Sequence, residues 1–376
     1  MLNRVSDSFQ AIFRSKPGFI VRAPGRVNLI GEHTDYNDGY VLPMAIDRAV
    51  WIALRPRTDR CMRIHSLDLE QAVEFDLDAI SAGEARWADY VKGVAQELQS
   101  ESYKLQGWEG VMSGDVPRGA GLSSSAALEV ATARAFASVS GFEWDGLRIA
   151  RMAQRAENNW VGVRSGIMDQ AVSAAAKAGH AFFLDCRSLE YEHIPMTKEM
   201  SVVVMDTSTR RGLVDSAYNE RHAQCEAAAK AFGVKSLRDV SREQFRLESG
   251  KLDETTMRRA RHIVTENARV LDAVQALRTQ DLPNLGRLFN ESHASLRDDF
   301  QVTGEALDLM VEIAQARPEC YGARMTGAGF GGCAVAVVRR EKADTFAKTV
   351  AANYGRRSGK EAVMFICEAG GGASVE

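Results

Sequence analysis

The chain has 376 residues, of which 45% are hydrophobic and 26% are charged, and its formal net charge is -3. This length exceeds the size that one hydrophobic core usually organises, so we expect two domains with a cleft between them. The nearly balanced charge argues against nucleic acid and membrane surfaces as partners, because both usually require a basic excess. The sequence therefore predicts small-molecule partners.

Six cysteines are scattered along the chain without a C-x-x-C pair, which favours reduced thiols over disulfides or a zinc site. No run of about 18 apolar residues occurs, so no membrane-spanning segment is expected. The first residues lack the apolar core of a signal peptide. We therefore predict a cytoplasmic protein, and a monomer, because no exposed heptad or apolar stripe stands out.

The N-terminal segment predicts an amphipathic helix and then a strand at 19–23, which Pro24 and Gly25 should end. The following residues, 25–36, read GRVNLIGEHTDY and place a guanidinium, two carboxylates, an imidazole and a phenol beside apolar side chains. Buried charges are costly unless they are paired. This density of charge therefore predicts a polar binding turn at the end of a short strand.

Strands are expected at 48–55 and within 62–75, and a helix at 87–99. A loop then precedes a helix that runs to about residue 138, with the sequence PRGAGLSSSAALEVA at 117–131. Glycines let a backbone approach a phosphate, and a helix N-terminus attracts anions. A simply capped helix start is the alternative, because serine is favoured at N-caps. The loop is not a Walker A motif, because no Gly-Lys-Ser/Thr follows its glycines.

A helix at 147–161 carries Glu157 at the border of its apolar face, where a carboxylate requires a cation. A turn at 163–170, a helix from 171 and a strand at 182–186 follow. We place the boundary between two lobes, 1–198 and 199–376, before a strand at 201–206. The C-terminal lobe is expected to contain helices at 218–232, 255–279, 282–296 and 304–316, strands at 333–338 and 362–367, and a helix from 342 between these strands. The tail GGGASVE is expected to be disordered.

Residues 327–332, with the sequence GAGFGG, formally match the pattern G-x-G-x-x-G. A dinucleotide-binding loop should follow a strand and open a helix, whereas this one precedes a strand. The segment instead predicts a tight turn that brings backbone close to the other lobe or to a ligand.

Three motifs, in this order, resemble the galactokinases within the GHMP family of small-molecule kinases, which includes homoserine, mevalonate and phosphomevalonate kinases. GRVNLIGEHTDY is similar to the signature of galactokinases themselves, whereas PRGAGLSSSAALEVA and MTGAGFGGCAVAV resemble motifs that the family shares more widely. GIMDQ and SAYNERHAQCE are also similar to galactokinase segments, so the resemblance spans nearly the whole chain.

The resemblance implies an α+β fold of two lobes, an N-terminal mixed-sheet lobe and a C-terminal ferredoxin-like lobe, with the active site between them. It implies the reaction of ATP with α-D-galactose to give α-D-galactose 1-phosphate and ADP, with Mg²⁺ as cofactor. Carried over position by position, it implies the following residues: Arg26 and Asp169 as catalytic; Glu32, His33, Thr34, Asp35, Asp169 and Tyr218 on the sugar; Gly119, Ala120, Gly121, Leu122, Ser123, Ser124 and Ser125 on the nucleotide; and Ser125 and Glu157 on the metal.

These residue types suit that chemistry. Carboxylates such as Glu32 and Asp35 accept hydrogen bonds from sugar hydroxyls, and each such bond contributes about 1.5–3 kcal/mol. Arg26 and a metal ion would neutralise the charge that spreads over a transferring phosphoryl group. Asp169 has two possible roles, because an ordinary Asp has a pKa of about 3.9, far below that of a sugar hydroxyl. It either takes the proton late in the reaction or orients the hydroxyl.

Two other functions remain open. An N-acetylgalactosamine kinase would share the signature, and a non-catalytic regulator could bind galactose and ATP. Such regulators resemble galactokinases that lack a Ser-Ala pair in the phosphate loop, whereas Ser125 and Ala126 are intact here. The chain departs from the common pattern in few places, among them Asp38, where glycine is frequent, and Ser165, where cysteine is common.

Overall fold

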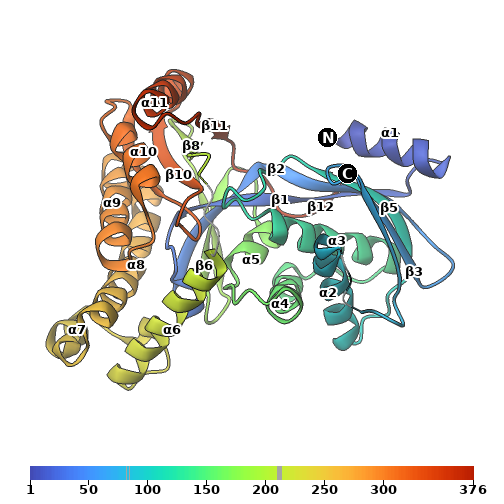
Figure 1. Ribbon diagram of the computed structural model, residues 1–376, viewed down its shortest axis with the longest axis horizontal. Helices are drawn as coiled ribbons and strands as arrows, with labels where there is room; N and C mark the ends of the chain where they lie inside the picture. Colours follow the sequence, from blue (N-terminus) through green and yellow to red (C-terminus); the bar gives the residue numbers. More distant parts are fainter. Residues whose placement is uncertain (82, 84, 210–213) are drawn as a thin grey trace.

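The computed structural model describes residues 1–81, 83, 85–209 and 214–376 of the chain. Two β-sheets, each covered by helices, form two lobes (Figure 1). The first sheet comes mainly from the N-terminal half of the chain and the second from the C-terminal half. The α+β class and the two-lobed architecture are therefore confirmed. Among the described helices, none combines the length and the apolar composition needed to cross a membrane.

The N-terminal lobe contains a mixed sheet. Six strands run in the order β12-β1-β2-β5-β3-β4, while β6 pairs with one end of β2 and β7 pairs with β6. The pair β3 and β5 is parallel, and the other pairs are antiparallel. The strands are Phe19–Ile30 (β1), Tyr40–Pro56 (β2), Cys61–Ser66 (β3), Gln71–Asp76 (β4), Trp108–Gly114 (β5), His180–Asp185 (β6), Tyr191–Pro195 (β7) and Ser374–Val375 (β12).

Helices cover both faces of this sheet: α1 lies on one face, and α2 to α5 lie on the other (Figure 1). The central helix α3 contacts β1, β2, α2, α4 and α5. Its residues from Ala126 to Ala137 are buried apart from Arg134, because alanine side chains let neighbours approach from every side. The helices are Leu2–Phe13 (α1), Arg86–Ser100 (α2), Ser124–Ser140 (α3), Gly146–Ala156 (α4) and Met168–Ala175 (α5).

The C-terminal lobe contains a four-stranded antiparallel sheet in the order β11-β8-β10-β9. Along the chain, strand β8 is followed by helices, then by β9 and β10, by one more helix and by β11. Numbered 1 to 4 along the chain, these strands lie in the spatial order 4-1-3-2, which is that of a ferredoxin-like fold. This expectation is confirmed. The elements are Met200–Asp206 (β8), Val214–Phe232 (α6), Arg242–Glu248 (α7), Glu254–Arg278 (α8), Leu282–Ser295 (α9), Glu305–Gln315 (α10), Cys320–Met325 (β9), Cys333–Arg339 (β10), Ala343–Ser358 (α11) and Val363–Cys367 (β11).

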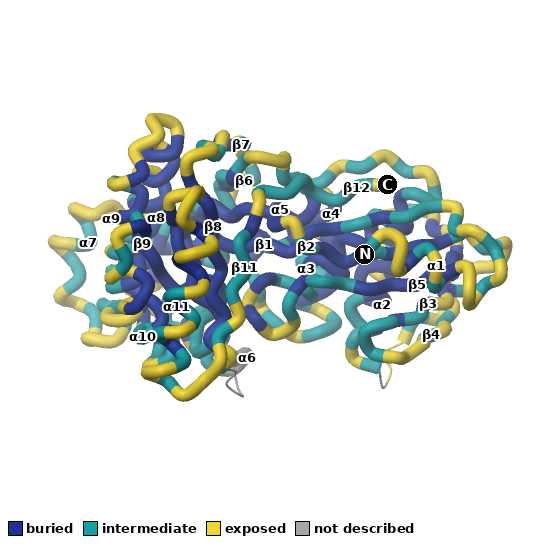
Figure 2. Tube along the Cα trace, turned by 90° about the horizontal axis from the view of Figure 1, so that it is seen from above, coloured by how far each residue is buried: buried dark blue, intermediate teal, exposed yellow. Residues whose placement is uncertain are grey.

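One hydrophobic cluster extends through both lobes, and a second lies within the C-terminal lobe. Val270 of α8 and Leu285 and Phe289 of α9 belong to the same buried cluster as Leu29 and Ile30 of β1. Figure 2 shows the buried interior running without interruption from the strands of one lobe to those of the other. The helices of the second lobe therefore hold the end of β1 in a fixed position.

Strand β1 is longer than predicted, because it continues through Pro24 and Gly25 to Ile30. The pairing with β2 shifts its register between Pro24 and Arg26, and the Arg26 backbone N–H then donates to the Leu122 carbonyl oxygen at 3.1 Å. A β-bulge therefore absorbs the Pro-Gly pair instead of ending the strand. Only Gly31 to Gly39 remain between β1 and β2.

The prediction of a disordered tail is also wrong. Residues Ser374–Val375 form β12, which pairs with Arg22 and Val21 of β1, and the Glu376 N–H donates to the Ile20 carbonyl at 2.9 Å. An exposed sheet edge leaves backbone groups without partners, and the tail supplies them. Although the second sheet begins at β8, the last residues of the chain thus return to the first sheet, so both termini lie on the N-terminal lobe (Figure 1). The predicted boundary after residue 198 stays a prediction.

Candidate active site

Two adjoining pockets lie where the lobes meet. The larger, of about 730 Å³, runs along residues 117–125 and faces Thr326 and 328–332 of the other lobe. The smaller, of about 150 Å³, is enclosed mainly by the turn after β1 and by residues 163–169. Arg26, Asp169 and Ala328 line both pockets. A ligand in one pocket would therefore touch a ligand in the other at these residues.

The two glycine-rich segments approach each other backbone to backbone in the larger pocket. A Cβ atom on Gly327 would lie 3.1 Å from the Gly121 carbonyl oxygen, and both glycines have positive φ, +83° and +74°. A side chain at either position would therefore be strained, and one at Gly327 would be crowded as well. The prediction that residues 327–332 bring backbone close to the other lobe is confirmed.

The phosphate loop is not an ordinary capped helix start. Ser123, the residue before α3, has a left-handed backbone with φ of 58°, and its side chain makes no capping hydrogen bond. Its hydroxyl instead donates to Oδ2 of Asp169. The first N–H groups of α3 are thus left without a side-chain cap, which favours an anion site over the capped-helix alternative.

Arg26 and Asp169 form a two-pronged ion pair at the junction of the pockets. The Arg26 Nε and Nη2 atoms donate to the two carboxylate oxygens of Asp169 at 2.8 and 2.7 Å. Nη1 of Arg26 donates to the carbonyl oxygen of Gly121 at 2.6 Å. Asp169 lies in the first turn of α5, so strand β1, the phosphate loop and α5 are tied together at one guanidinium.

The smaller pocket gathers most of the predicted sugar-binding residues. Its lining includes Glu32, His33, Asp35, Asp169 and Tyr218. Thr34 is not among the lining residues: it is completely buried, and its hydroxyl donates to the carbonyl oxygens of Gly31 and Tyr40. Thr34 thus closes the turn from inside.

The Asp35 carboxyl lies directly against Gly166. A Cβ atom on Gly166 would come within 2.0 Å of Asp35 Oδ2, so any side chain there would displace the carboxyl. Burial and the nearby Asp169 carboxylate raise the pKa of Asp35 to about 7. The site therefore disfavours the charged form of Asp35, and a hydrogen bond from a ligand hydroxyl would stabilise that form.

His33 offers a neutral imidazole to the same pocket. Its backbone is left-handed, with φ of 64°, and its Nδ1 lies 2.9 Å from the Tyr36 hydroxyl. Burial, with a contribution from His262 and nearby cations, lowers the pKa of His33 to about 3. Within the described part of the chain Nε2 has no hydrogen-bond partner, so it remains available to a ligand hydroxyl.

Tyr218 completes this side of the pocket. Its ring centroid lies 5.5 Å from that of His33 and 5.3 Å from that of Tyr36. Burial and the carboxylates of Asp35 and Asp169 keep the pKa of Tyr218 well above its usual range. The phenol therefore stays protonated and can donate to a ligand.

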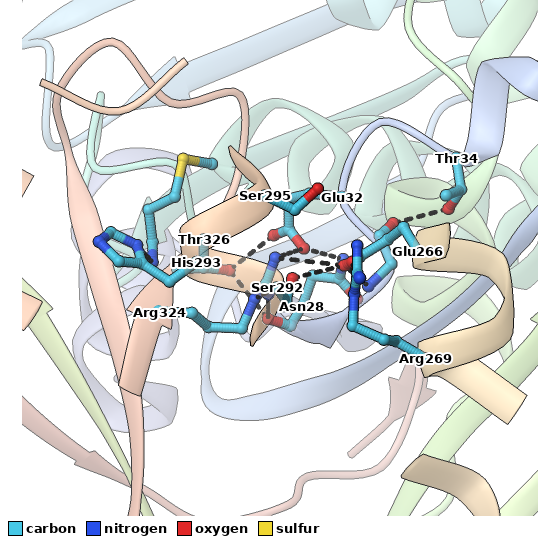
Figure 3. A network of polar contacts seen from close by, with 12 residues as sticks. Asn28, Glu32, Thr34, Glu266, Arg269, Ser292, His293, Ser295, Arg324 and Thr326 are labelled. Carbon is cyan, nitrogen blue, oxygen red and sulfur yellow. Dashed lines mark hydrogen bonds and ion pairs between the residues drawn. The ribbon is translucent and has the colours of Figure 1, made fainter. Parts of the chain in front are cut away.

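Glu32 has a second role that the sequence did not predict. Its carboxylate accepts hydrogen bonds from Asn28 Nδ2 at 2.6 Å, Arg324 Nη2 at 2.6 Å, Thr326 Oγ1 at 3.1 Å and the Gly327 N–H at 2.8 Å. Burial raises the pKa of Glu32, although the Arg324 guanidinium opposes this. Figure 3 shows this carboxylate surrounded by donors from both lobes.

The same network continues behind Glu32 into the C-terminal lobe. Arg324 is fully buried, and it also donates to the Leu29 carbonyl at 3.0 Å. Glu266 accepts from Arg269 at 2.7 Å and from Ser292 at 2.6 Å (Figure 3). Burial would raise the pKa of Glu266, but the surrounding cations outweigh it and lower the pKa to about 2. Two buried carboxylates are thus matched by two guanidinium groups.

Glu157 and Ser125 come together as predicted. Glu157 begins a wide turn of the π type at the end of α4, and such turns frequently mark functional sites. Its carboxylate accepts from the Ser165 hydroxyl at 2.5 Å and hydrogen-bonds with Ser125. Burial raises the pKa of Glu157 despite the hydrogen bond from Ser165. A carboxylate and a hydroxyl are hard oxygen ligands of the kind that Mg²⁺ prefers, and Mg²⁺ usually takes only one or two from protein.

The described residues contain no group of three or more His, Cys, Asp or Glu side chains arranged to hold a metal. The Asp38 departure is accommodated. Asp38 adopts φ of 57°, the conformation that makes glycine frequent in such turns, and its carboxylate lies 3.3 Å from Arg187 Nε.

A third pocket, of about 540 Å³, opens on the other side of the phosphate loop. Arg118, Ser124 and Ser125 line both it and the larger pocket. Trp87 and Tyr90 of α2 are among its lining residues. No sequence motif predicts this pocket, because its walls come from strands and helices that are far apart in the chain.

Comparisons with known proteins agree with this geometry. A galactose-binding signature of galactokinases matches residues 7–56, and the N-terminal and C-terminal domains of GHMP kinases match residues 89–177 and 273–356. A galactokinase of Roseiflexus sp. (strain RS-1) is 46% identical over 371 residues, which cover 97% of this chain and 95% of that protein. A galactokinase of Chloroflexus aurantiacus is 44% identical over 379 residues, which cover 99% of this chain and 97% of that protein.

A solved structure of the Lactococcus lactis galactokinase in complex with galactose superposes with a TM-score of 0.95, at 37% identity and 99% coverage of both chains. The mevalonate kinase of Methanococcus jannaschii superposes with a TM-score of 0.67 at 18% identity, covering 95% of this chain and 99% of that one. The second likeness concerns the fold alone.

Proposed function

This chain belongs to the galactokinase family of the GHMP kinases, and we propose that it transfers the γ-phosphoryl group of ATP to the anomeric hydroxyl of α-D-galactose. The products are α-D-galactose 1-phosphate and ADP. One observation carries this proposal: the small polar pocket opens onto the phosphate-loop pocket at Arg26 and Asp169. A phosphoryl donor in one pocket and an acceptor hydroxyl in the other would meet there, and phosphoryl transfer depends chiefly on such positioning.

The nucleotide extends across two pockets in this proposal. The phosphates lie over residues 119–125, where the N–H groups at the start of α3 point at them. The nucleoside occupies the third pocket against Trp87 and Tyr90, because that pocket shares Ser124 and Ser125 with the phosphate site. An aromatic wall of this kind suits the flat face of a base.

Mg²⁺ is held by Ser125 and Glu157 in this proposal. Bound there, it would neutralise charge on the phosphate oxygens and orient them. The hydrogen bond between Ser125 and Glu157 supports the assignment, because it brings two hard oxygen donors to the edge of the phosphate loop.

Galactose lies in the small pocket among Asp35, His33 and Tyr218. These residues offer a carboxylate, a phenol and an imidazole nitrogen that has no hydrogen-bond partner in the described part of the chain. Glu32 closes the rear of the pocket, where its oxygens already accept from four protein donors. A sugar hydroxyl on Glu32 would share an oxygen with one of them. Fixed acceptors of this kind penalise a misplaced hydroxyl, since a buried polar group is then left unpaired.

Arg26 and Asp169 act on the reacting atoms. Asp169 accepts the hydrogen of the anomeric hydroxyl, orients it towards the phosphorus and takes the proton late. Arg26 and Ser123 fix the direction of its carboxylate through three hydrogen bonds. Arg26 lines the phosphate pocket as well, where it stabilises the charge of the transferring group.

Two variants test these roles. Arg26→Ala should lower kcat on the order of 100-fold or more, because it removes a donor to the charge that develops in the transition state. Asp169→Asn keeps the size of the side chain but removes the acceptor charge, and it should lower kcat while the Kd for galactose changes little. Steady-state kinetics and calorimetric sugar binding separate the two quantities. Near-normal turnover of Asp169→Asn would remove Asp169 from the mechanism.

The substrate is tested by coupled ADP release with galactose, glucose, N-acetylgalactosamine, arabinose, mevalonate and homoserine. Galactose should give the highest kcat/KM. Preference for N-acetylgalactosamine would favour the related amino-sugar kinase, and binding without turnover would indicate a regulator. Activity on mevalonate or homoserine but on no sugar would overturn the proposal.

We also propose that the protein acts as a monomer in the cytoplasm. All six cysteines, each in the described part of the chain, are free thiols, which suits a reducing compartment. Light scattering over a range of concentrations tests the oligomeric state, and a mass of about twice 41.2 kDa would contradict a monomer.

A further inference from the structure

Gln170 joins two carboxylates through one nitrogen. It is completely buried on α5, directly after Asp169. Its Nε2 atom donates to Glu129 Oε2 and to Glu157 Oε2, each at 3.0 Å. In each contact the amide N–H donates and a carboxyl oxygen accepts. One amide group thus uses both of its N–H bonds to link α3 with the turn that follows α4.

The requirements of the fold do not explain Glu129. It is fully buried in the alanine-rich centre of α3. In the described part of the chain its Oε1 has no hydrogen-bond partner, so its contact with the neutral Gln170 amide is its main compensation. Burial and the nearby Glu157 raise the pKa of Glu129 well above the usual range. A buried carboxyl with so little compensation is less stable than an apolar residue of the same size.

We propose that Glu129 and Gln170 are positioning residues for Glu157. The inference rests on the proposed function, in which Glu157 is a ligand of Mg²⁺. Glu129 fixes the plane of the Gln170 amide, and Gln170 together with Ser165 fixes Oε2 of Glu157. The other oxygen of Glu157, Oε1, is then the one presented to the metal ion beside Ser125.

The position of Gln170 couples this support to the rest of the site. Glu129 belongs to the helix that begins at the phosphate loop, Glu157 directly follows α4, and Gln170 follows the catalytic Asp169. A shift of any of these three helices would stretch the same pair of hydrogen bonds. Partners behind a metal ligand typically change metal affinity by about 10- to 100-fold when they are removed.

Calorimetry with a non-hydrolysable ATP analogue tests the proposal without turnover. Its Kd is measured with Mg²⁺ and again with EDTA, and the ratio gives the gain in affinity that the metal provides. Gln170→Leu and Glu129→Leu should reduce this gain about tenfold or more, while the Kd in EDTA and the Kd for galactose stay unchanged. Glu129→Gln, which keeps an oxygen for the Gln170 amide, should retain most of the metal-dependent gain in affinity.

Two further variants serve as references. Thr132→Val removes another buried polar group of α3, whose hydroxyl donates only within the helix to the Leu128 carbonyl, and it should leave the metal-dependent gain unchanged. Glu157→Gln should abolish the gain. If Glu157→Gln keeps the metal-dependent gain, Glu157 is not a metal ligand. That result would contradict the proposed function and not the positioning role alone.

If Glu157→Gln loses the gain and Gln170→Leu retains it, the positioning role is wrong. An equal loss of affinity in EDTA would also contradict it, because it would show damage to the phosphate loop instead. Should the leucine variants not fold, the pair Glu129→Gln and Glu129→Asp decides. The shorter Asp side chain withdraws from Gln170 and should lose the gain that Gln preserves, and equal behaviour of the two would overturn the proposal.

Discussion

The Asp35 carboxyl combines a raised pKa with a place in the small pocket, which makes it sensitive near neutral pH. Burial and Asp169 raise its pKa to about 7, above the ordinary value of 3.8. The folded, ligand-free protein therefore binds a proton that the unfolded chain releases, so this group lowers stability as pH rises from about 4 to 7. The charged form is the better acceptor for a sugar hydroxyl.

The KM for galactose should consequently fall as the pH rises from 6 to 8. Asp35→Asn should raise KM and abolish this dependence, because the amide does not titrate in that range. Initial-rate measurements at several pH values, at saturating ATP, check this. An unchanged pH profile in Asp35→Asn would assign the titration to another group.

Gly166 holds the place that the Asp35 carboxyl needs. A Cβ atom in that position would lie 2.0 Å from Asp35 Oδ2, so Gly166→Ala must push the carboxyl away. We expect the KM for galactose to rise about tenfold, which corresponds to about 1.4 kcal/mol of lost binding, with a smaller effect on kcat. Gly250→Ala is the matched control, since nothing lies within 4 Å of a Cβ atom there. Equal kinetics in both variants would show that Asp35 does not bind the sugar.

For single residues, the sequence identified most of those that line the small pocket, but not the residues that hold them in place. Six charged or aromatic residues of the small pocket lie within motifs that the sequence shows: Arg26, Glu32, His33, Asp35, Asp169 and Tyr218. Arg324, in contrast, is separated from Glu32 by 292 positions, and no local pattern connects the two. Glu129 did leave a signal, a lone acid in an apolar run of α3, but the Gln170 amide that explains it lies on another helix.

Among the elements, helices were easier to predict than strands. Helix α8, expected at 255–279, spans Glu254–Arg278, because its apolar residues recur at helical spacing. The predicted strand at 19–23 ends at Pro24 and Gly25, because local preference alone disfavours both residues inside a strand. The observed strand β1 continues to Ile30. The strand continues because it pairs with β2 and because the Arg26 N–H donates to the Leu122 carbonyl, 96 positions further along the chain. Strand β9, at Cys320–Met325, carries a buried arginine and gave no alternating pattern.

The terminal strand β12 should contribute measurably to stability. Deletion of Gly370 to Glu376 removes the pairing of Val375 and Ser374 with β1 and exposes that edge of the sheet. We expect a loss of about 2 kcal/mol in the free energy of unfolding, from a few backbone hydrogen bonds and cross-strand contacts. Urea denaturation measures it, and Ser374→Ala, which keeps the backbone pairing, should cost much less. A truncated protein as stable as the full chain would show that β12 is only loosely attached.

For the whole molecule, the Glu32 network determines how firmly the lobes are joined. Arg324→Met leaves Glu32 and Glu266 buried with one cation fewer, and breaking a buried pair in this way costs about 3–5 kcal/mol. Chemical denaturation should show this loss, and the KM for galactose should rise as Glu32 moves. Arg340→Met is the control, because its pair with Glu368 is exposed and such pairs contribute about 0–1 kcal/mol. Similar stabilities of the two variants would mean that the network is not needed to join the lobes.

The two-lobed arrangement itself followed from motif order and resemblance, whereas the way the lobes join did not. The shared core of α8, α9 and β1 and the return of the tail to the first sheet both depend on contacts between distant segments. Such contacts are selected by the packing of the complete chain, so a reading of local periodicity cannot reveal them.

The length of strand β1 sets the distance between the phosphate loop and the sugar pocket. The strand carries Arg26 at the phosphate loop and continues, with a register shift between Asn28 and Ile30, to the residue directly before the turn that holds the sugar-pocket residues. Each residue of a strand advances about 3.3 Å and faces the side opposite to its neighbour. A single inserted or deleted residue between Arg26 and Gly31 would therefore move the whole turn by that step and reverse the faces of the strand. Substitutions in the turn can alter which sugar is accepted, but the number of residues that separates it from Arg26 has to stay constant.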